Sequence, residues 1–215
     1  MPNAVTGEDA AETLNAEIAC AAPIAKLAGY DHEKSGGLFT FGGTATNLYG
    51  FKMGLYKALP THGLKGINGT KVAIIGSQPA HYSHQTGANW IGIGQDNYIQ
   101  VRSNTDQTTR LDELESVCRK TIEAGKRIAC IEAVGGTTSN MAIDDFESIY
   151  KMREGLVKDY QLDYSPHLHA DAVLGWAYLN FLDYDIDQNK LGFTEPVLMK
   201  IKKVTEKLRT LKYVD

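Results

Sequence analysis

Segments of two kinds alternate along the chain. Continuous apolar and β-branched runs at 71–77, 127–134 and 166–173 predict buried strands, and the alternating stretch 98–102 predicts another. A further short strand is predicted at 36–41. Apolar residues at helical spacing predict helices over 9–28, over 48–59, from just after His84 to about 90, over 111–124, from 144 or 145 to about 160, and over 195–211. This alternation predicts an α/β fold, with a mostly parallel sheet and helices on both faces.

Three residues indicate where helices break or begin. Pro23 predicts a break within 9–28, because proline has no backbone N–H to donate. Thr109 is expected to cap the helix that follows it. Asp144 is expected to act as an N-cap, without a catalytic role.

Composition excludes some classes of partner. The 215 residues are 43% hydrophobic and 22% charged with a net charge of -4, and they contain no basic stripe, so nucleic acid is not an expected partner. No apolar run is long enough to span a membrane, and the polar, acidic start does not resemble a secretion signal. Three scattered cysteines, Cys20, Cys118 and Cys130, are expected to be reduced and buried, as in a cytoplasmic protein.

The strand at 166–173 carries unusual chemistry. Its alternation places His167, His169 and Asp171 on one face. A carboxylate near the end of an apolar strand is costly unless a cation meets it. A metal ion, a protonated ring nitrogen and a structural salt bridge are the partners that the residues leave open.

Other polar groups also follow predicted strands. The stretch 42–47 has two glycines and the hydroxyls of Thr44 and Thr46, which suits either a phosphate cradle or an ordinary helix cap. His81 follows the strand 71–77 and could serve as a ring-stacking platform, an acid–base group, a metal ligand or none of these. The Gly- and Thr-rich loop 135–140 is the third such group. In a parallel sheet these groups and Asp171 would gather at one edge.

A metal hydrolase is one hypothesis for this edge. His167, His169 and Asp171 have the spacing found in enzymes that bind zinc pairs. The metallo-β-lactamase pattern, however, has a second His directly after the Asp, where this chain has Ala172. That fold also places its motif early in the sequence, whereas here the motif lies late.

Four motifs in order resemble a known family. They are Gly42-Gly-Thr-Ala-Thr-Asn47, Ser77-Gln-Pro-Ala-His-Tyr-Ser83, Ala133-Val-Gly-Gly-Thr-Thr138 with Asp144, and His169-Ala-Asp-Ala-Val173. This order is similar to that of the group II pyridoxal-phosphate-dependent decarboxylases, which include aromatic amino acid, glutamate and diaminobutyrate decarboxylases. The resemblance runs from about residue 10 to the end of the chain. It implies the large domain of a fold-type I enzyme that releases carbon dioxide from an amino acid.

The resemblance also implies roles for individual residues. Asp171 would pair with the protonated pyridine nitrogen of pyridoxal phosphate, and His81 would stack on the ring. Thr138 would lie beside the ring and the substrate. The phosphate would contact Ala45 and Thr46, with Thr44 beside them.

One departure from the family concerns the lysine that forms the Schiff base. In the family it follows a His, whereas no His-Lys pair occurs in this sequence, which ends at Lys212-Tyr-Val-Asp215. We therefore expect 1–215 to be a single incomplete domain, with an N-terminal helix at about 9–28 and an α/β core at about 36–215. Alone it is expected to have little or no decarboxylase activity. An exposed sheet edge, and the dimers of the family, imply a homo-oligomer or a complementing chain.

Three alternatives remain at this point. The chain could belong to another fold-type I enzyme, a cysteine desulfurase or an aminotransferase. It could be a non-catalytic remnant that binds a partner through its exposed face. It could also be the metal hydrolase described above. Aromatic, acidic and basic amino acids all remain possible substrates.

Overall fold

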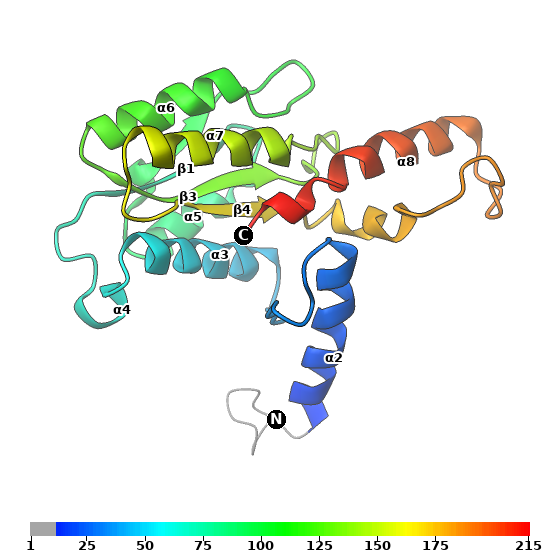
Figure 1. The fold of residues 1–215 in the computed structure, drawn as a ribbon, viewed down its shortest axis with the longest axis horizontal. Coiled ribbons are helices and arrows are strands. Elements are labelled where there is room, and N and C mark those ends of the chain that lie inside the picture. The colour runs from blue at the N-terminus through cyan, green and yellow to red at the C-terminus, as the bar shows by residue number, and fades with distance from the viewer. Residues whose placement is uncertain (1–11) are drawn as a thin grey trace.

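The computed structural model describes residues 12–215, and its centre is a parallel sheet (Figure 1). The strands are β1 (Val72–Ser77), β2 (Tyr98–Val101), β3 (Arg127–Val134) and β4 (His167–Asp171). They lie in the order β2-β1-β3-β4, and every neighbouring pair is parallel. The predicted α/β fold is confirmed.

Helices and short helical turns connect and cover the strands. The α-helices are α2 (Glu12–Leu27), α3 (Gly43–Ala58), α4 (His62–Lys65), α5 (Ser83–Trp90), α6 (Leu111–Glu123), α7 (Phe146–Asp159) and α8 (Glu195–Leu208). The 3-10 helices are η1 (Gln95–Asn97), η2 (Trp176–Phe181) and η3 (Leu211–Tyr213).

The sheet is buried on both faces. Helices α6, α7 and α8 supply residues such as Leu114, Phe146 and Leu208 to the core on one face. Helices α3 and α5 supply Phe51 and Ala88 to the core on the other face. Every residue of β1 is buried, and so is nearly all of β3. Burial on both faces explains why the sequences of these two strands are continuous apolar runs.

The predicted break at Pro23 is wrong. Helix α2 runs through Pro23 without interruption. The ring lies at an exposed position, and none of the side chains of α2 is buried. The lost backbone hydrogen bond therefore leaves a carbonyl group that water can reach. Helix α2 extends away from the sheet (Figure 1), and the first residues of the predicted 9–28 helix lie outside the described part of the chain.

The predicted strand at 36–41 is also wrong. The segment joins no strand of the sheet. Its apolar residues Leu38, Phe39 and Phe41 are exposed, Phe41 to 88%. A β-strand needs a partner for its backbone groups, and none lies beside this segment within residues 12–215. Helix α3 then begins at Gly43, five residues earlier than expected, after Gly42 makes a turn with φ 129°.

The helix caps differ from the prediction. Asp145, and not Asp144, caps α7 by accepting a hydrogen bond from the Ser148 N–H at 3.0 Å. Asp144 is buried and accepts hydrogen bonds from the N–H and hydroxyl of Thr109 and from the Val134 N–H, at 2.7, 2.8 and 2.8 Å. Thr109 therefore does not cap α6, because its hydroxyl is already used to tie this loop to the end of β3.

The cysteines are free thiols. Cys118 and Cys130 are buried as expected, whereas Cys20 on α2 is exposed, which corrects the prediction for that residue. Within residues 12–215, every helix is too short or too polar to cross a membrane.

The outer edge of β4 is partly paired. The Asp215 N–H donates to the Leu168 carbonyl at 3.0 Å, and the Asp215 carboxylate accepts from the Leu168 N–H at 2.8 Å. The same carboxylate accepts from the guanidinium of the buried Arg153 at 2.5 Å. This edge of the sheet therefore carries a strand-like contact beyond β4.

Candidate functional site

A cavity of about 250 Å³ lies at the carboxyl ends of β3 and β4. It is lined by Gly43, Thr44, Asn47, His81, Ser83, Val134, Gly136, Thr137, Thr138, Asp171, Val173 and Leu174. These residues come from the starts of α3 and α5, from the loop before α5, and from the last residues of β3 and β4 with the segments that follow them. The cavity is where a parallel α/β sheet usually binds its ligand.

Four of the six predicted site residues line this cavity, namely Thr44, His81, Thr138 and Asp171. Ala45 and Thr46 do not. The side chain of Ala45 is buried, and the hydroxyl of Thr46 lies 2.7 Å from the Thr40 hydroxyl.

The start of α3 borders the cavity. The amides of Ala45 and Thr46 donate to the Gly42 carbonyl at 3.0 and 3.2 Å. The residues of this turn that line the cavity are Gly43 and Thr44. The turn begins a helix of 16 residues, so its positive dipole end favours an anionic group.

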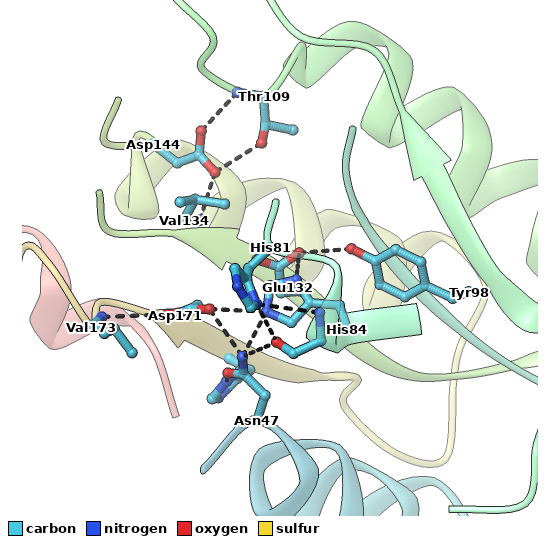
Figure 2. Close-up of polar contacts among 12 residues, drawn as sticks. Asn47, His81, His84, Tyr98, Thr109, Glu132, Val134, Asp144, Asp171 and Val173 are labelled. Atoms are coloured by element: carbon cyan, nitrogen blue, oxygen red, sulfur yellow. Dashed lines mark hydrogen bonds and ion pairs between the residues drawn. The ribbon is translucent and has the colours of Figure 1, made fainter. Parts of the chain in front are cut away.

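Asp171 is held firmly by its neighbours (Figure 2). Its Oδ2 atom accepts a hydrogen bond from Asn47 Nδ2 at 2.9 Å and lies 3.0 Å from His84 Nε2. Its Oδ1 atom accepts only the Val173 N–H among the described residues, at 3.3 Å. Burial raises the pKa of this carboxyl, but the hydrogen bonds from His84 and Asn47 outweigh burial and hold the pKa well below its usual value. Asp171 is therefore an anion whose Oδ1 can accept a further donor.

Asn47 connects Asp171 to His169. Its Oδ1 atom lies 2.8 Å from His169 Nε2, while its Nδ2 reaches Asp171 and also Ser83 Oγ at 3.2 Å. Burial, together with the nearby His167, lowers the pKa of His169 to about 3. His169 is therefore neutral, with its proton on Nε2 facing Asn47. Gly50 of α3 makes this packing possible, because a Cβ there would lie 2.5 Å from His169 Nδ1.

A second buried group lies behind Asp171. His84 Nδ1 lies 3.5 Å from Glu132 Oε2, and Tyr98 donates its hydroxyl to the same oxygen at 3.1 Å. Glu132 and His84 are fully buried. Sequence analysis gave no role to Asn47, His84 or Glu132. Glu132 had a signal, because it is the one charged residue in the apolar run 128–134.

His81 is exposed beside the cavity. Its Nδ1 atom accepts a hydrogen bond from the Ser83 N–H at 3.3 Å and lies 2.9 Å from Ser83 Oγ. Its ring lies against Tyr82, with centroids 4.2 Å apart. The ring is thus oriented by Ser83.

The two threonines of the loop 135–140 have different surroundings. The hydroxyl of Thr137 donates to Asn140 Oδ1 at 2.5 Å and accepts from the Ala142 N–H at 3.0 Å. Thr137 therefore shapes the loop. Thr138 is exposed and lines the cavity, so its hydroxyl is the one open to a ligand.

The geometry does not support the metal hydrolase. His167 stacks on His169 and lies 3.5 Å from Asp215, while His169 turns to Asn47. Among residues 12–215, no three His, Cys, Asp or Glu side chains form a group that could hold a metal ion.

A family comparison identifies the chain. The model of the pyridoxal-dependent decarboxylase conserved domain matches residues 3–180. The chain belongs to this family. The family and its pyridoxal cofactor are those that the four sequence motifs predict.

Curated relatives have names that refer to decarboxylases of different amino acids. The chain is 32% identical to a glutamate decarboxylase-like protein of Gibberella zeae over 126 residues, which are 59% of this chain and 24% of that protein. It is 34% identical to an L-tyrosine decarboxylase of Levilactobacillus brevis over 109 residues, which are 50% of this chain and 17% of that protein. The matches thus span about a quarter or less of these relatives.

Solved structures confirm the fold. Mouse CSAD in its apo form matches 98% of this chain and 38% of its own chain, with a TM-score of 0.74 and 21% identity. Tryptophan decarboxylase of Catharanthus roseus in complex with L-tryptophan matches 98% of this chain and 40% of its own, with a TM-score of 0.70 and 15% identity.

Proposed function

We propose that this chain supplies the part of an amino acid decarboxylase site that holds the ring and phosphate of pyridoxal phosphate. The observation that carries the proposal is Asp171, an anionic carboxylate anchored through Oδ2 at the edge of a cavity where parallel strands end. When bound, the cofactor supplies a ring that accepts the electron pair left as carbon dioxide departs.

The residues around the cavity fit this cofactor. Asp171 would accept a hydrogen bond from the protonated ring nitrogen and stabilise its charge. His81, whose ring is oriented by Ser83, would cover the face of the pyridine ring. Thr138 would bind beside the ring and the substrate.

The phosphate would lie at the start of α3. Gly43 and Thr44 line the cavity there, and the helix dipole favours an anion. Thr46 and Ala45 would contribute to the same turn. Their amides shape it by donating to the Gly42 carbonyl.

The 215 residues offer no equivalent of the family lysine. None of the six histidines is followed by a lysine. The chain alone would therefore bind the cofactor without the covalent link that catalysis in this family uses. We propose that these residues form one incomplete domain, active as a carboxy-lyase only with the residues that complete it.

A second copy or a complementing chain is the proposed partner. Tyr49, Met53 and Tyr56 form an exposed stripe along α3, and the exposed Phe39 and Phe41 precede it. Such a patch favours association. The free thiols are consistent with a cytoplasmic location.

Titration with pyridoxal phosphate tests the proposal. We expect saturable binding. After borohydride reduction, intact mass analysis should show the unmodified chain, because no imine is present to be trapped. A mass increase on one lysine would refute the absence of a Schiff-base residue. Assays of a completed protein should find carbon dioxide and not sulfide, which separates a decarboxylase from a desulfurase.

A further inference from the structure

His84 lies between two acidic side chains in the interior. Its Nε2 atom is 3.0 Å from Asp171 Oδ2, and its Nδ1 atom is 3.5 Å from Glu132 Oε2. Figure 2 shows the three side chains close together, with the Tyr98 hydroxyl donating to Glu132 on the side away from Asp171. Nε2 also lies 2.8 Å from Asn47 Nδ2, and Nδ1 makes no hydrogen bond among the described residues. A proton on each ring nitrogen would face one carboxylate on either side of the ring.

The charges on the surrounding elements favour that state. Burial lowers the pKa of His84, but Glu132 on β3 and Asp171 on β4 together raise it above its ordinary value. Burial raises the pKa of Glu132 to about 7, although His84 opposes this rise. Two other titratable groups near the cluster are His169 on β4, which is neutral, and Tyr98 on β2. Cys130 contributes to raising the pKa of Tyr98, and Asp144 contributes to raising the pKa of Glu132.

The net charge of the cluster formed by His84, Asp171 and Glu132 suits a cationic ligand. An isolated ion pair between His84 and Asp171 would be neutral and would leave nothing for a cationic ligand. Above about pH 7, the raised pKa of Glu132, this residue adds a second negative charge, and the ionised cluster then carries one net negative charge. One protonated ring nitrogen at Asp171 would balance it. A buried carboxylate is costly unless a positive charge or hydrogen bonds offset its burial. Glu132 Oε1 has no hydrogen-bond partner among the described residues.

We infer that His84 is a positioning residue for Asp171, and that Glu132 is the counter-charge that keeps His84 protonated. His84 holds Asp171 ionised and fixed through Oδ2, so that Oδ1 meets the ring nitrogen. Glu132 supplies the negative charge that the ring nitrogen then neutralises. The inference deepens the proposed function and rests on it.

The ligand-free chain gives the first test. Nitrogen NMR of the histidine side chains, with His84 assigned by its loss in His84→Gln, follows each imidazole between about pH 5 and about pH 9. We expect His84 to be doubly protonated at neutral pH, and Glu132→Gln to lower its pKa by about one unit or more. Glu147→Gln, which removes a partly exposed carboxylate of α7 paired with Lys151, should not change it.

Two results would overturn the inference. One is a neutral His84 at pH 7, and the other is a pKa of His84 that Glu132→Gln leaves unchanged. If Glu132→Gln does not fold, Tyr98→Phe replaces it, because loss of the hydroxyl makes Glu132 harder to ionise and should lower the pKa of His84 in the same direction.

Binding of pyridoxine 5′-phosphate gives the second test. This probe has the ring nitrogen and the phosphate but no aldehyde, so it needs no lysine. We expect His84→Gln and Glu132→Gln each to weaken binding about tenfold and to shift the ring absorbance toward the unprotonated form. Equal affinity and equal spectra in all variants would refute the inference while the proposed function stands. No binding by the unchanged chain would refute the proposed function, and with it the role of His84 toward a ring nitrogen.

Discussion

His84 Nε2 lies 3.0 Å from Asp171 Oδ2, so a side chain of α5 and a side chain of β4 meet below the cavity. Asn47 Nδ2 reaches the same oxygen at 2.9 Å from α3. Two separate helices, α3 and α5, thus hold one carboxylate oxygen of β4. Because each donor is itself buried, the position of Asp171 depends on the packing of α3 and α5 against the sheet.

The stability of the chain should fall as the pH rises from about 4.5 to about 7. Glu132 has an ordinary pKa of 4.5, and burial raises the pKa in the folded chain to about 7. Between these values the unfolded state has released the proton while the folded state keeps it, so a higher pH favours unfolding. His84, whose pKa is also raised, adds stability below about pH 6.5 that is lost as the pH rises through its folded pKa.

Glu132→Gln should remove most of this dependence. The loss across the window is at most on the order of 3 kcal/mol, because one unit of pKa corresponds to about 1.4 kcal/mol. Urea unfolding at about pH 5 and about pH 8 measures it, with Glu147→Gln as the control at a partly exposed carboxylate. A Glu132→Gln variant that keeps the full wild-type dependence would show that another group causes it.

Gly50→Ala should destabilise the chain by about 2 kcal/mol, because the new Cβ would lie 2.5 Å from His169 Nδ1. The displaced ring would also release Asn47 and weaken cofactor binding. Gly155→Ala is the matched control, since it is also a helical glycine and nothing lies within 4 Å of its Cβ position. It should stabilise the chain by about 0.5 to 1 kcal/mol. Thermal unfolding of both variants makes the comparison, and similar changes in both would contradict the packing described for α3.

Asp144→Ala should cost about 3 kcal/mol of stability. The change leaves the N–H groups of Thr109 and Val134 buried without an acceptor. Asp145→Ala, one residue later, removes only the cap of α7 and should cost about 1 kcal/mol. Urea unfolding of the two variants compares the neighbours directly. If the costs were reversed, Asp144 would be the cap, as the sequence alone suggested.

Met53→Ser should weaken the proposed self-association about tenfold or more. Met53 is at the centre of the exposed stripe on α3, with Tyr49 and Tyr56 on either side. Sedimentation equilibrium measures the dissociation constant. Leu191→Ser replaces a residue of similar exposure in the loop before α8 and should have no effect. An unchanged dissociation constant for Met53→Ser would place the interface elsewhere.

The sequence predicts the sheet well because burial on both faces leaves a strong local pattern. The runs that form β1 and β3 are apolar almost throughout, and their ends agree with prediction within one residue. The segment 36–41 fails for a non-local reason. Its residues suit a strand, but a strand forms only where a neighbouring strand pairs with it. The predicted break at Pro23 is wrong because the hydrogen bond that proline removes is costly only where the freed carbonyl group is shielded from water. At Pro23 water reaches that group, so the helix continues.

The candidate site is only partly visible in the sequence. Motifs locate Thr44, His81, Thr138 and Asp171, which line the cavity. His84 and Asn47 matter through contacts across 87 and 124 positions of sequence to Asp171, which no local pattern records. Asp144 looks like a cap because it precedes a helix, and only the folded loop at Thr109 shows its other use.

Binding of pyridoxal phosphate to three forms of the chain tests the central claim most directly. The forms are the unchanged chain, Asp171→Ala, and Asp187→Ala, which changes an exposed loop carboxylate. The account predicts one saturable site in the unchanged chain and in Asp187→Ala, with affinity at least about tenfold weaker in Asp171→Ala. Equal binding by all three, or no binding by any, would contradict it.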